Sequence, residues 1–421
     1  RMTSSSLNKF IWNNAIVFIL LNSSGALNYI FQIILGRTLS PEQYGGFNSL
    51  LATSALITTP FTILHLVFSR FIARMTDNKL QKIKSLLTIC LKTILAIVFG
   101  IALIGLLSAQ WLQNFLHTET TLPIILMLLA TCFSAFQQVL VAVCEGMQRF
   151  LALGIISGGG TLARLLFAIL FVVVLGWGIE GGLLAVTFAA SSALVFGVWQ
   201  LRDVFKSQAV DLPSNSWLEM ARFSIPSFLM ITMVAIMCNI DIILVRHYCP
   251  QDQAGYYATA TILGRIAFFL PSSLLMVLFP SVAKATASGA KDHQYLFVSL
   301  GLTTILSGIV FLVFFLAGQS IIQVVYGNQY FSAAPLLTIV TAAMGLLAVS
   351  HVIFSYNMAR SEFGFLWPLI GGVLLMLSLV FLYHDSAKTI AWILLFSTVT
   401  IFLGTILNRA YLSFFQPKPP I

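Results

Sequence analysis

Charged residues are scarce in this 421-residue chain. They make up 8% of the sequence, with 13 Asp and Glu residues in total, whereas hydrophobic residues make up 59%. Soluble domains have about a quarter of their residues charged, so this composition excludes an ordinary soluble protein. The apolar stretches are continuous, unlike the alternating strands of a barrel, and approach the ~20 residues that a membrane-crossing helix needs. The chain is therefore predicted to be an all-α integral membrane protein.

Sequence motifs of catalysis are also missing. The chain has no GxxxxGK[ST], HExxH or GxSxG pattern, and its five cysteines show neither paired nor metal-like spacing. A GxGxxG pattern does occur at Gly176 to Gly181, but it joins two apolar segments instead of a strand and a helix, so it is interpreted as a tight external turn. We expect no cofactor, no metal site and no enzymatic activity.

Twelve apolar segments are long enough to be membrane spans, six in each half of the chain. The first is too long for a secretory signal sequence and is expected to be retained. The segments are Lys9 to Leu35, Phe47 to Phe68, Ser85 to Ser108, Leu122 to Val143, Leu151 to Leu175, Gly181 to Gln200, Met220 to Tyr248, Ala254 to Phe279, Tyr295 to Leu316, Ala334 to Tyr356, Phe365 to Tyr383 and Thr389 to Arg409.

The net charge of +9 follows the predicted topology. With the N-terminus in the cytoplasm, fifteen Lys and Arg residues fall on that side and three, Arg37, Arg246 and Lys388, fall on the other. This is the positive-inside bias that orients membrane proteins. Both termini are therefore predicted to be cytoplasmic, and the basic balance requires no nucleic-acid partner.

A repeated motif divides the chain into two related halves. Leu35 to Phe47 and Val245 to Tyr256 each end an apolar run with an Arg, turn at a Pro, and return to apolar sequence through Gly and an aromatic residue. At a similar offset, the turn Gly146 to Arg149 resembles Asn357 to Arg360. We predict a six-helix bundle over residues 1–208 and a second one over 209–421.

Charged side chains within the predicted spans are the first candidates for a functional site. Arg164 and Arg265 are expected near mid-membrane, and Asp241 near the external end of the seventh span. Such residues usually face a cavity or a partner. Two guanidinium groups against one carboxylate favour an anionic substrate, because guanidinium suits bidentate phosphate binding. Asp241 is the candidate for ion coupling, and a fixed ion pair with an Arg is the structural alternative for these charges.

Two amides of the first span, Asn28 and Gln32, fall on one helix face. They are candidates for the wall of a substrate cleft. Hydrogen bonds to neighbouring helices are the alternative explanation.

These motifs together resemble those of the polysaccharide transporter (Wzx-type) family, in the multidrug/oligosaccharidyl-lipid/polysaccharide exporter superfamily. The resemblance covers essentially the whole chain. It rests on Gly36 to Gly45, the turn Glu145 to Phe150, Ile225 with Pro226, Asp241, and Gly255 to Tyr257. It implies two six-helix bundles, related by an axis along the membrane normal, around a central cleft that opens alternately to each side.

The resemblance further implies a flippase in the bacterial inner membrane that serves lipopolysaccharide or capsule export. Its cargo would be a polyprenyl-diphosphate-linked oligosaccharide, and its partners would be membrane lipids and candidate polysaccharide assembly proteins. An ion-coupled multidrug or metabolite antiporter is an alternative, although cationic drugs favour more buried acids than arginines. A membrane enzyme or scaffold of glycan assembly is the second alternative.

Overall fold

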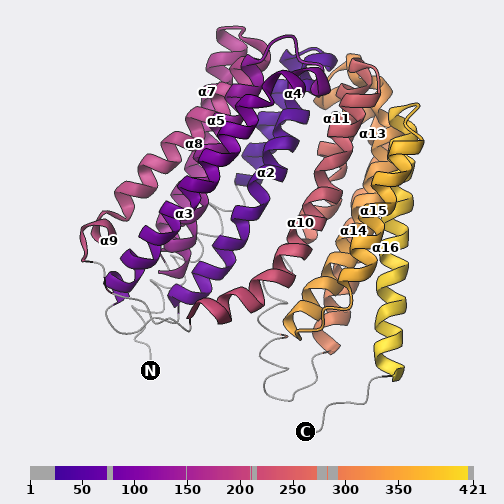
Figure 1. The fold of residues 1–421 in the computed structure, drawn as a ribbon. Coiled ribbons are helices and arrows are strands. Elements are labelled where there is room, and N and C mark those ends of the chain that lie inside the picture. The colour runs from indigo at the N-terminus through magenta and orange to yellow at the C-terminus, as the bar shows by residue number, and fades with distance from the viewer. Residues whose placement is uncertain are drawn as a thin grey trace, which may run out of the picture. The chain divides into compact units, whose positions relative to one another are not determined.

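The computed structural model describes residues 24–73, 79–147, 149–208, 210, 216–272, 282 and 293–415. Every regular element in these ranges is a helix (Figure 1), which confirms the predicted all-helical class. The first predicted span begins at Lys9, so its part before residue 24 lies outside the described residues. Its remainder forms a helix over residues 24–38.

The chain divides into two compact units. The first takes the residues up to Leu39 together with Thr53–Ile225, and the second takes Ser40–Ala52 and the chain from Pro226 onward. Helix α2 (Pro41–Ala73) therefore contributes its first part to the second unit. The division into two related bundles at residues 208 and 209 stays a prediction.

In the first unit, α5 is central, because it packs against both α8 and α3. Its buried side chains join those of α3 and the helices after it in one core that includes Leu87, Val139 and Ile156. The helices that follow α2 in this unit are α3 (Lys79–Leu107), α4 (Ala109–Leu116), α5 (Leu122–Gly146), α6 (Phe150–Gly154), η1 (Ile155–Gly159), α7 (Gly160–Ala168), η2 (Ile169–Val174), α8 (Gly178–Gln200) and α9 (Arg202–Lys206).

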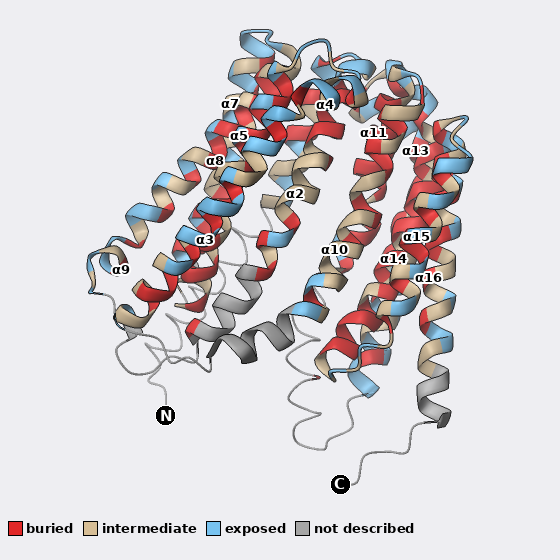
Figure 2. Ribbon diagram, in the orientation of Figure 1, coloured by how far each residue is buried: buried red, intermediate tan, exposed pale blue. Residues whose placement is uncertain are grey.

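In the second unit, α14 is central and contacts α11, α13 and α16. Most of its length is buried, as Figure 2 shows. The helices are α10 (Ser216–Tyr248), which starts in the first unit, α11 (Gln251–Gly264), a helix over residues 266–272, α13 (His293–Val325), the short 3₁₀ helix η3 (Asn328–Ala333), α14 (Ala334–Ala359), α15 (Leu366–Leu382) and α16 (Ala387–Phe415).

Eight helical stretches in the described residues are long and apolar enough to cross a membrane, and each overlaps one predicted span. The apolar helix Leu366–Leu382 is shorter and overlaps another. The count of twelve spans stays a prediction. The eight are Leu80–Leu107, Leu122–Gly146, Leu151–Val174, Gly178–Gln200, Ile225–Tyr248, His293–Val325, Asn328–Ala359 and Ala387–Arg409.

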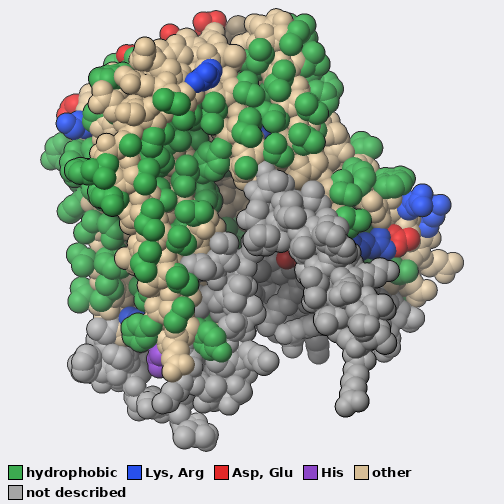
Figure 3. Space-filling view, turned by 180° about the vertical axis from the view of Figure 1, so that it is seen from behind, with side chains coloured by type: hydrophobic (Ala, Val, Ile, Leu, Met, Phe, Trp, Pro, Cys, Tyr) green, Lys and Arg blue, Asp and Glu red, His purple; other side chains and the backbone are tan. Residues whose placement is uncertain are grey.

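The outer surface of these helices is apolar. Large hydrophobic side chains such as Phe99, Leu316 and Phe381 are exposed, and Figure 3 shows hydrophobic side chains spread along the described helices in that view. Water would penalise this exposure, whereas lipid would not. The surface therefore agrees with a multi-pass membrane protein.

The first copy of the repeated motif starts α2 with a capping box. The Gln43 amide N–H donates to Ser40 Oγ at 3.2 Å, and the Ser40 N–H donates to Gln43 Oε1 at 3.4 Å. Pro41 occupies the first helical position, where its missing N–H has no cost. In the second copy, Pro250 precedes α11, and Gln253 Oε1 accepts from the Ala387 N–H at 3.1 Å. The predicted turns are confirmed, with different polar contacts.

The two motif copies touch each other within the second unit. A Cβ on Gly45 would lie 2.6 Å from the Gly255 nitrogen, closer than real atoms approach. Nearby, Tyr44 is fully buried, with its hydroxyl 3.4 Å from that of Tyr326 and its ring packed edge-on against Tyr330. Glycine at positions 45 and 255 therefore allows the start of α2 to pack closely on α11.

The turn with the GxGxxG pattern lies between η2 and α8. Gly176 and Gly178 have φ angles of +67° and +58°, a region that glycine enters without steric cost. The structure confirms a tight turn here.

Candidate functional site

Arg164 lies in a distorted part of the fifth predicted span. It belongs to α7, which has a π-helical segment on each side, η1 before it and η2 after it. Single-turn π segments inside α-helices often occur at functional sites. One turn before Arg164 in α7, a Cβ added to Gly160 would lie 3.3 Å from Ala193 Cβ of α8. Glycine at this position therefore lets α7 approach α8 closely.

A polar cavity of about 160 Å³ opens beside Arg164. It is smaller than the ~300–1,000 Å³ pockets that enclose whole drug-sized ligands, so it suits one charged or polar group of a larger molecule. Its lining comes from α5, η1, α7 and α8, and consists of Ser134, Gln137, Ser157, Gly160, Thr161, Arg164, Val186, Ala189 and Ala190.

The Arg164 guanidinium is held by neutral partners. Its Nη2 donates to Asn28 Oδ1, and its Cζ lies 4.5 Å from the centre of the Phe31 ring, a cation–π contact. Its Nε is buried and has no hydrogen-bond partner. No ion pair joins Arg164 to a carboxylate in the described part of the chain. This site therefore carries an uncompensated positive charge and a spare donor.

The two predicted amides of the first span have different positions. Asn28 contacts Arg164, as described, whereas Gln32 is a buried residue one turn further along the same helix. Neither amide is part of the cavity lining. Sequence analysis missed Gln137, Ser134 and Phe31, although polar residues within an apolar span such as Gln137 are a usable signal.

Arg265 has a different environment, because it faces Asp241. Its Nη2 lies 3.8 Å from Asp241 Oδ1 and donates a hydrogen bond to the Cys238 carbonyl. The Asp241 carboxylate has no exposed surface, and its Oδ2 accepts from the Tyr257 hydroxyl at 3.0 Å. The pair is therefore close to neutral as a whole. The structure brings Arg265 and Asp241 together, and the positive excess counted in the sequence lies at Arg164.

The described residues hold no group of three or more His, Cys, Asp and Glu side chains placed to bind a metal ion. The arrangement that they do hold is a buried cation with hydroxyl and amide groups around an adjacent cavity. Such a site can bind an anionic group by charge-assisted hydrogen bonds.

The described helices are apolar on their outer surface and enclose a polar site beside Arg164. Solved structures show the same fold. A multidrug resistance MATE family transporter of the MOP superfamily, in an inward-facing conformation, has a TM-score of 0.79 at 12% identity, covering 93% of this chain and 94% of that chain.

Two further solved structures share the fold. The lipid II flippase MurJ, in an inward closed conformation, has a TM-score of 0.72 at 12% identity, covering 94% of this chain and 87% of that chain. A MOP superfamily transporter from Pyrococcus furiosus, described as having a binding pocket of reverse polarity, has a TM-score of 0.63 at 13% identity, covering 96% and 95%.

The family is identified from the sequence itself. Residues 11–286 match the family described as polysaccharide biosynthesis protein, and this chain belongs to that family. No curated protein sequence matches the chain. This match confirms the predicted relationship at the level of the polysaccharide biosynthesis family.

Proposed function

We propose that this chain is a flippase that moves a polyprenyl-diphosphate-linked oligosaccharide from the cytoplasmic to the outer face of the bacterial inner membrane. Family membership supports a role in polysaccharide biosynthesis. The fold shared with transporters and with a lipid II flippase supports transport rather than catalysis. Candidate assembly-protein partners and a role in lipopolysaccharide or capsule export belong to the same proposal.

The observation that carries the proposal is the uncompensated Arg164 beside its polar cavity. A diphosphate carries negative charge and several acceptor oxygens, which match the guanidinium and its spare Nε donor. Hydroxyl and amide groups of Ser134, Gln137 and Thr161 line the same cavity, and these groups also suit sugar hydroxyls. An organic cation would be repelled by Arg164.

Alternating access in this proposal uses twelve spans in two bundles with both termini in the cytoplasm. The eight candidate spans support that architecture, together with the helix over residues 24–38, α2, the helical residues 251–272 and α15. The helical run of the second unit is interrupted at Arg265, and α7, which carries Arg164, has a π-helical segment on each side. Such irregular helices commonly form the substrate and ion sites of transporters.

The test is transbilayer movement of a polyprenyl-diphosphate oligosaccharide in proteoliposomes. We expect Arg164→Gln to abolish movement and Arg164→Lys to retain part of it, because Lys keeps the charge and loses the fork geometry. Arg202→Gln is the matched control, since Arg202 is an exposed arginine of the same unit. Full movement by Arg164→Gln in a folded protein would refute the proposed site.

The second candidate function is an ion-coupled multidrug or metabolite antiporter. The fully buried Asp241 and the fold shared with MATE transporters favour it. In this case proteoliposomes with the parent protein would take up a small organic cation in exchange for protons or sodium ions that move down their own gradient. Asp241→Asn would abolish this uptake. The proposed roles of Asp241 in coupling, and of Arg265 and Gln32 in the cleft, are tested in the same assay.

A further inference from the structure

A basic and aromatic cluster occupies one end of the second unit, where α13 begins and α14 and α16 approach their ends. Tyr356 of α14 is its fully buried centre. The Tyr356 hydroxyl lies 3.2 Å from His293 Nδ1 and accepts from Arg360 Nη1 at 3.2 Å. The Arg409 guanidinium of α16 lies over the Tyr356 ring at 4.5 Å. Three helices thus bring basic side chains to one aromatic ring.

Among the described side chains of this cluster, the two guanidinium groups of Arg360 and Arg409 occur with one carboxylate, that of Glu362. Arg360 Nε is paired with Glu362 Oε1 at 2.8 Å. Arg409 has no ion pair in the described residues, and its Nη1 is buried without a hydrogen-bond partner. A buried guanidinium nitrogen without a partner costs free energy unless a ligand accepts from it. The cluster is therefore suited to bind an anion.

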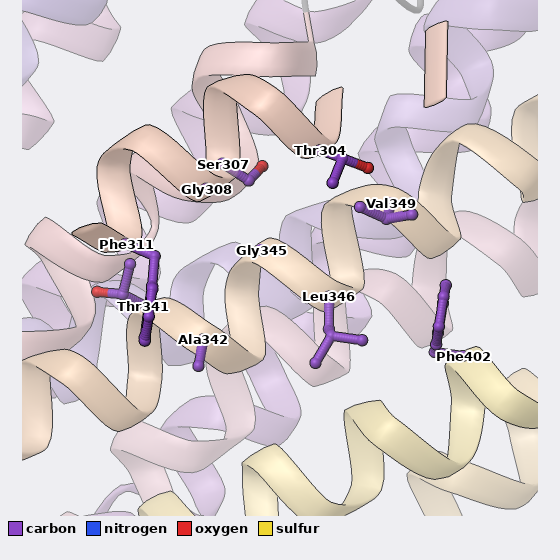
Figure 4. Close-up of a pocket in the computed structure, with 10 residues that line it drawn as sticks. All are labelled: Thr304, Ser307, Gly308, Phe311, Thr341, Ala342, Gly345, Leu346, Val349 and Phe402. Carbon is purple, nitrogen blue, oxygen red and sulfur yellow. The ribbon is translucent and has the colours of Figure 1, made fainter. Parts of the chain in front are cut away.

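An apolar groove lies on the same three helices. Figure 4 shows it, with lining residues that include Thr304 and Gly308 of α13, Gly345 and Val349 of α14 and Phe402 of α16. Its volume is about 320 Å³. The walls of this groove consist mainly of carbon atoms.

Two of the three hydroxyl groups in the groove wall, those of Ser307 and Thr341, have partners within the unit. Ser307 Oγ donates to the Ala267 carbonyl at 2.8 Å, and Thr341 Oγ1 donates to the Leu337 carbonyl at 2.6 Å. Each donor is therefore used within the unit. A hydrocarbon chain fits these walls, and a sugar does not.

Helical periodicity aligns the cluster with the groove. Residues seven or eleven positions apart lie on the same face of an α-helix, separated by two or three turns, or about 10 to 17 Å along the axis. The cluster residues are related in this way to groove residues on each helix. The pairs are His293 with Thr304, Val349 with Tyr356, and Phe402 with Arg409.

We propose that this face of the second unit is a binding site for the polyprenyl diphosphate carrier of the cargo, with the diphosphate at Arg409 and the chain in the groove. The assignment rests on the proposed function for its occupant. Among the described side chains, the charges of the two arginines and Glu362 are two guanidinium groups and one carboxylate, which favours an anionic group with many acceptor oxygens. A diphosphate has more of these oxygens than a phospholipid phosphodiester. By the positive-inside rule this end is cytoplasmic, so the site would load the carrier before transfer.

The test is direct binding of a long-chain polyprenyl diphosphate to the full-length protein in nanodiscs of zwitterionic lipid. Arg409→Gln removes the cation, and Gly308→Phe fills the groove, because an added Cβ at Gly308 meets no atom within 4 Å. The matched controls are Lys388→Gln at the opposite end of α16 and Gly371→Phe on α15, where a Cβ is equally free. Polyprenol, inorganic diphosphate and phosphatidylglycerol are the competitor probes.

We expect about tenfold weaker binding for Arg409→Gln, since losing one charge-assisted hydrogen bond has roughly that effect, and a similar loss for Gly308→Phe. The two controls should bind like the parent, and neither polyprenol nor inorganic diphosphate should compete well alone. Unchanged binding in both variants, or equal competition by phosphatidylglycerol, would overturn the proposal. The binding assay does not depend on transport. Transport by a protein whose binding is unchanged in both variants would overturn this site and leave the proposed function. Binding at this site by a protein that does not transport would have the opposite meaning.

Discussion

Arg164 and Arg265 are both arginines within apolar helical segments, one in each unit, and they differ in what faces them. Arg265 is paired with Asp241, whereas Arg164 has an amide, an aromatic ring and a cavity. Both lie in helical segments whose sequence is otherwise mainly apolar, where an unpaired charge is costly. The contrast shows that the pairing of charges in three dimensions, and not their number in the sequence, decides which site can bind an anion.

The largest expected effect comes from breaking the paired site. Arg265→Leu leaves the Asp241 carboxylate buried without its cation, which should cost about 3–5 kcal/mol of stability. We expect a strongly lowered melting temperature for the detergent-solubilised protein. The double variant Arg265→Leu with Asp241→Asn should recover most of the loss, since no charge is then left unpaired. If the single and double variants melt alike, the pair does not contribute as described.

A carboxylate placed beside Arg164 would make the two sites alike. Gln137 lines the Arg164 cavity, and Gln137→Glu changes its amide to a carboxylate of almost the same shape. We expect transport of a polyprenyl-diphosphate oligosaccharide in proteoliposomes to slow about tenfold, roughly 1.4 kcal/mol in the barrier, with the fold kept. Ser134→Ala, in the same wall, introduces no charge and is the control. Equal transport by parent and Gln137→Glu would argue against an anion at this cavity.

Removing Arg164 should disturb stability less than removing Arg265. Arg164→Leu leaves no buried carboxylate behind, and the Asn28 amide loses one hydrogen-bond donor. We expect a change of about 1 kcal/mol, measured by the same thermal unfolding as for Arg265→Leu. A loss as large as that of Arg265→Leu would mean that Arg164 has a structural ion-pair role.

The smallest effect is expected at an exposed pair. Arg149 donates to both carboxylate oxygens of Asp203 and, from Nη1, to the Gln200 carbonyl at 2.7 Å. The hydrogen bond from Arg149 lowers the pKa of Asp203. The pair therefore stabilises the fold above the ordinary Asp pKa of about 4, and the contribution is lost as pH falls through the lower folded-state pKa.

Because both side chains are partly exposed, this contribution is at most about 1 kcal/mol. Asp203→Asn should lower the melting temperature slightly at pH 7, and the difference should shrink at low pH as the Asp203 carboxylate becomes protonated. A difference that persists at the low pH would show that the pair does not act through its charges.

The two turns of the internal repeat show how far sequence similarity predicts contacts. The first turn, Gly146 to Arg149, is joined to α8 and α9 by the hydrogen bonds of Arg149 to Gln200 and Asp203. Its Gln148 lies outside the described residues. In the second, Arg360 pairs with Glu362 only two positions away and contacts Tyr356. The similar sequences predict similar turns, but the partners come from segments that differ between the halves.

The amino-acid sequence by itself determined the class of this protein. Long apolar runs require backbone hydrogen bonds to be satisfied within each segment, so an all-helical membrane protein follows. The motifs around Pro41 and Pro250 predicted the turns. Together with Glu145 to Phe150, Ile225 with Pro226, and Asp241, they carried the family resemblance. Arg164, Arg265 and Asp241 were recognised as candidate site residues because a charge in an apolar run stands out.

The tertiary structure alone decided which of these charges are compensated. Asn28 and Arg164 are 136 positions apart in the chain, and neither spacing nor composition relates them. Arg409 and His293 meet around Tyr356 for the same reason. Helical periodicity predicts the face of one helix, whereas packing between helices sets the neighbour of that face, and an electrostatic site depends on the neighbour.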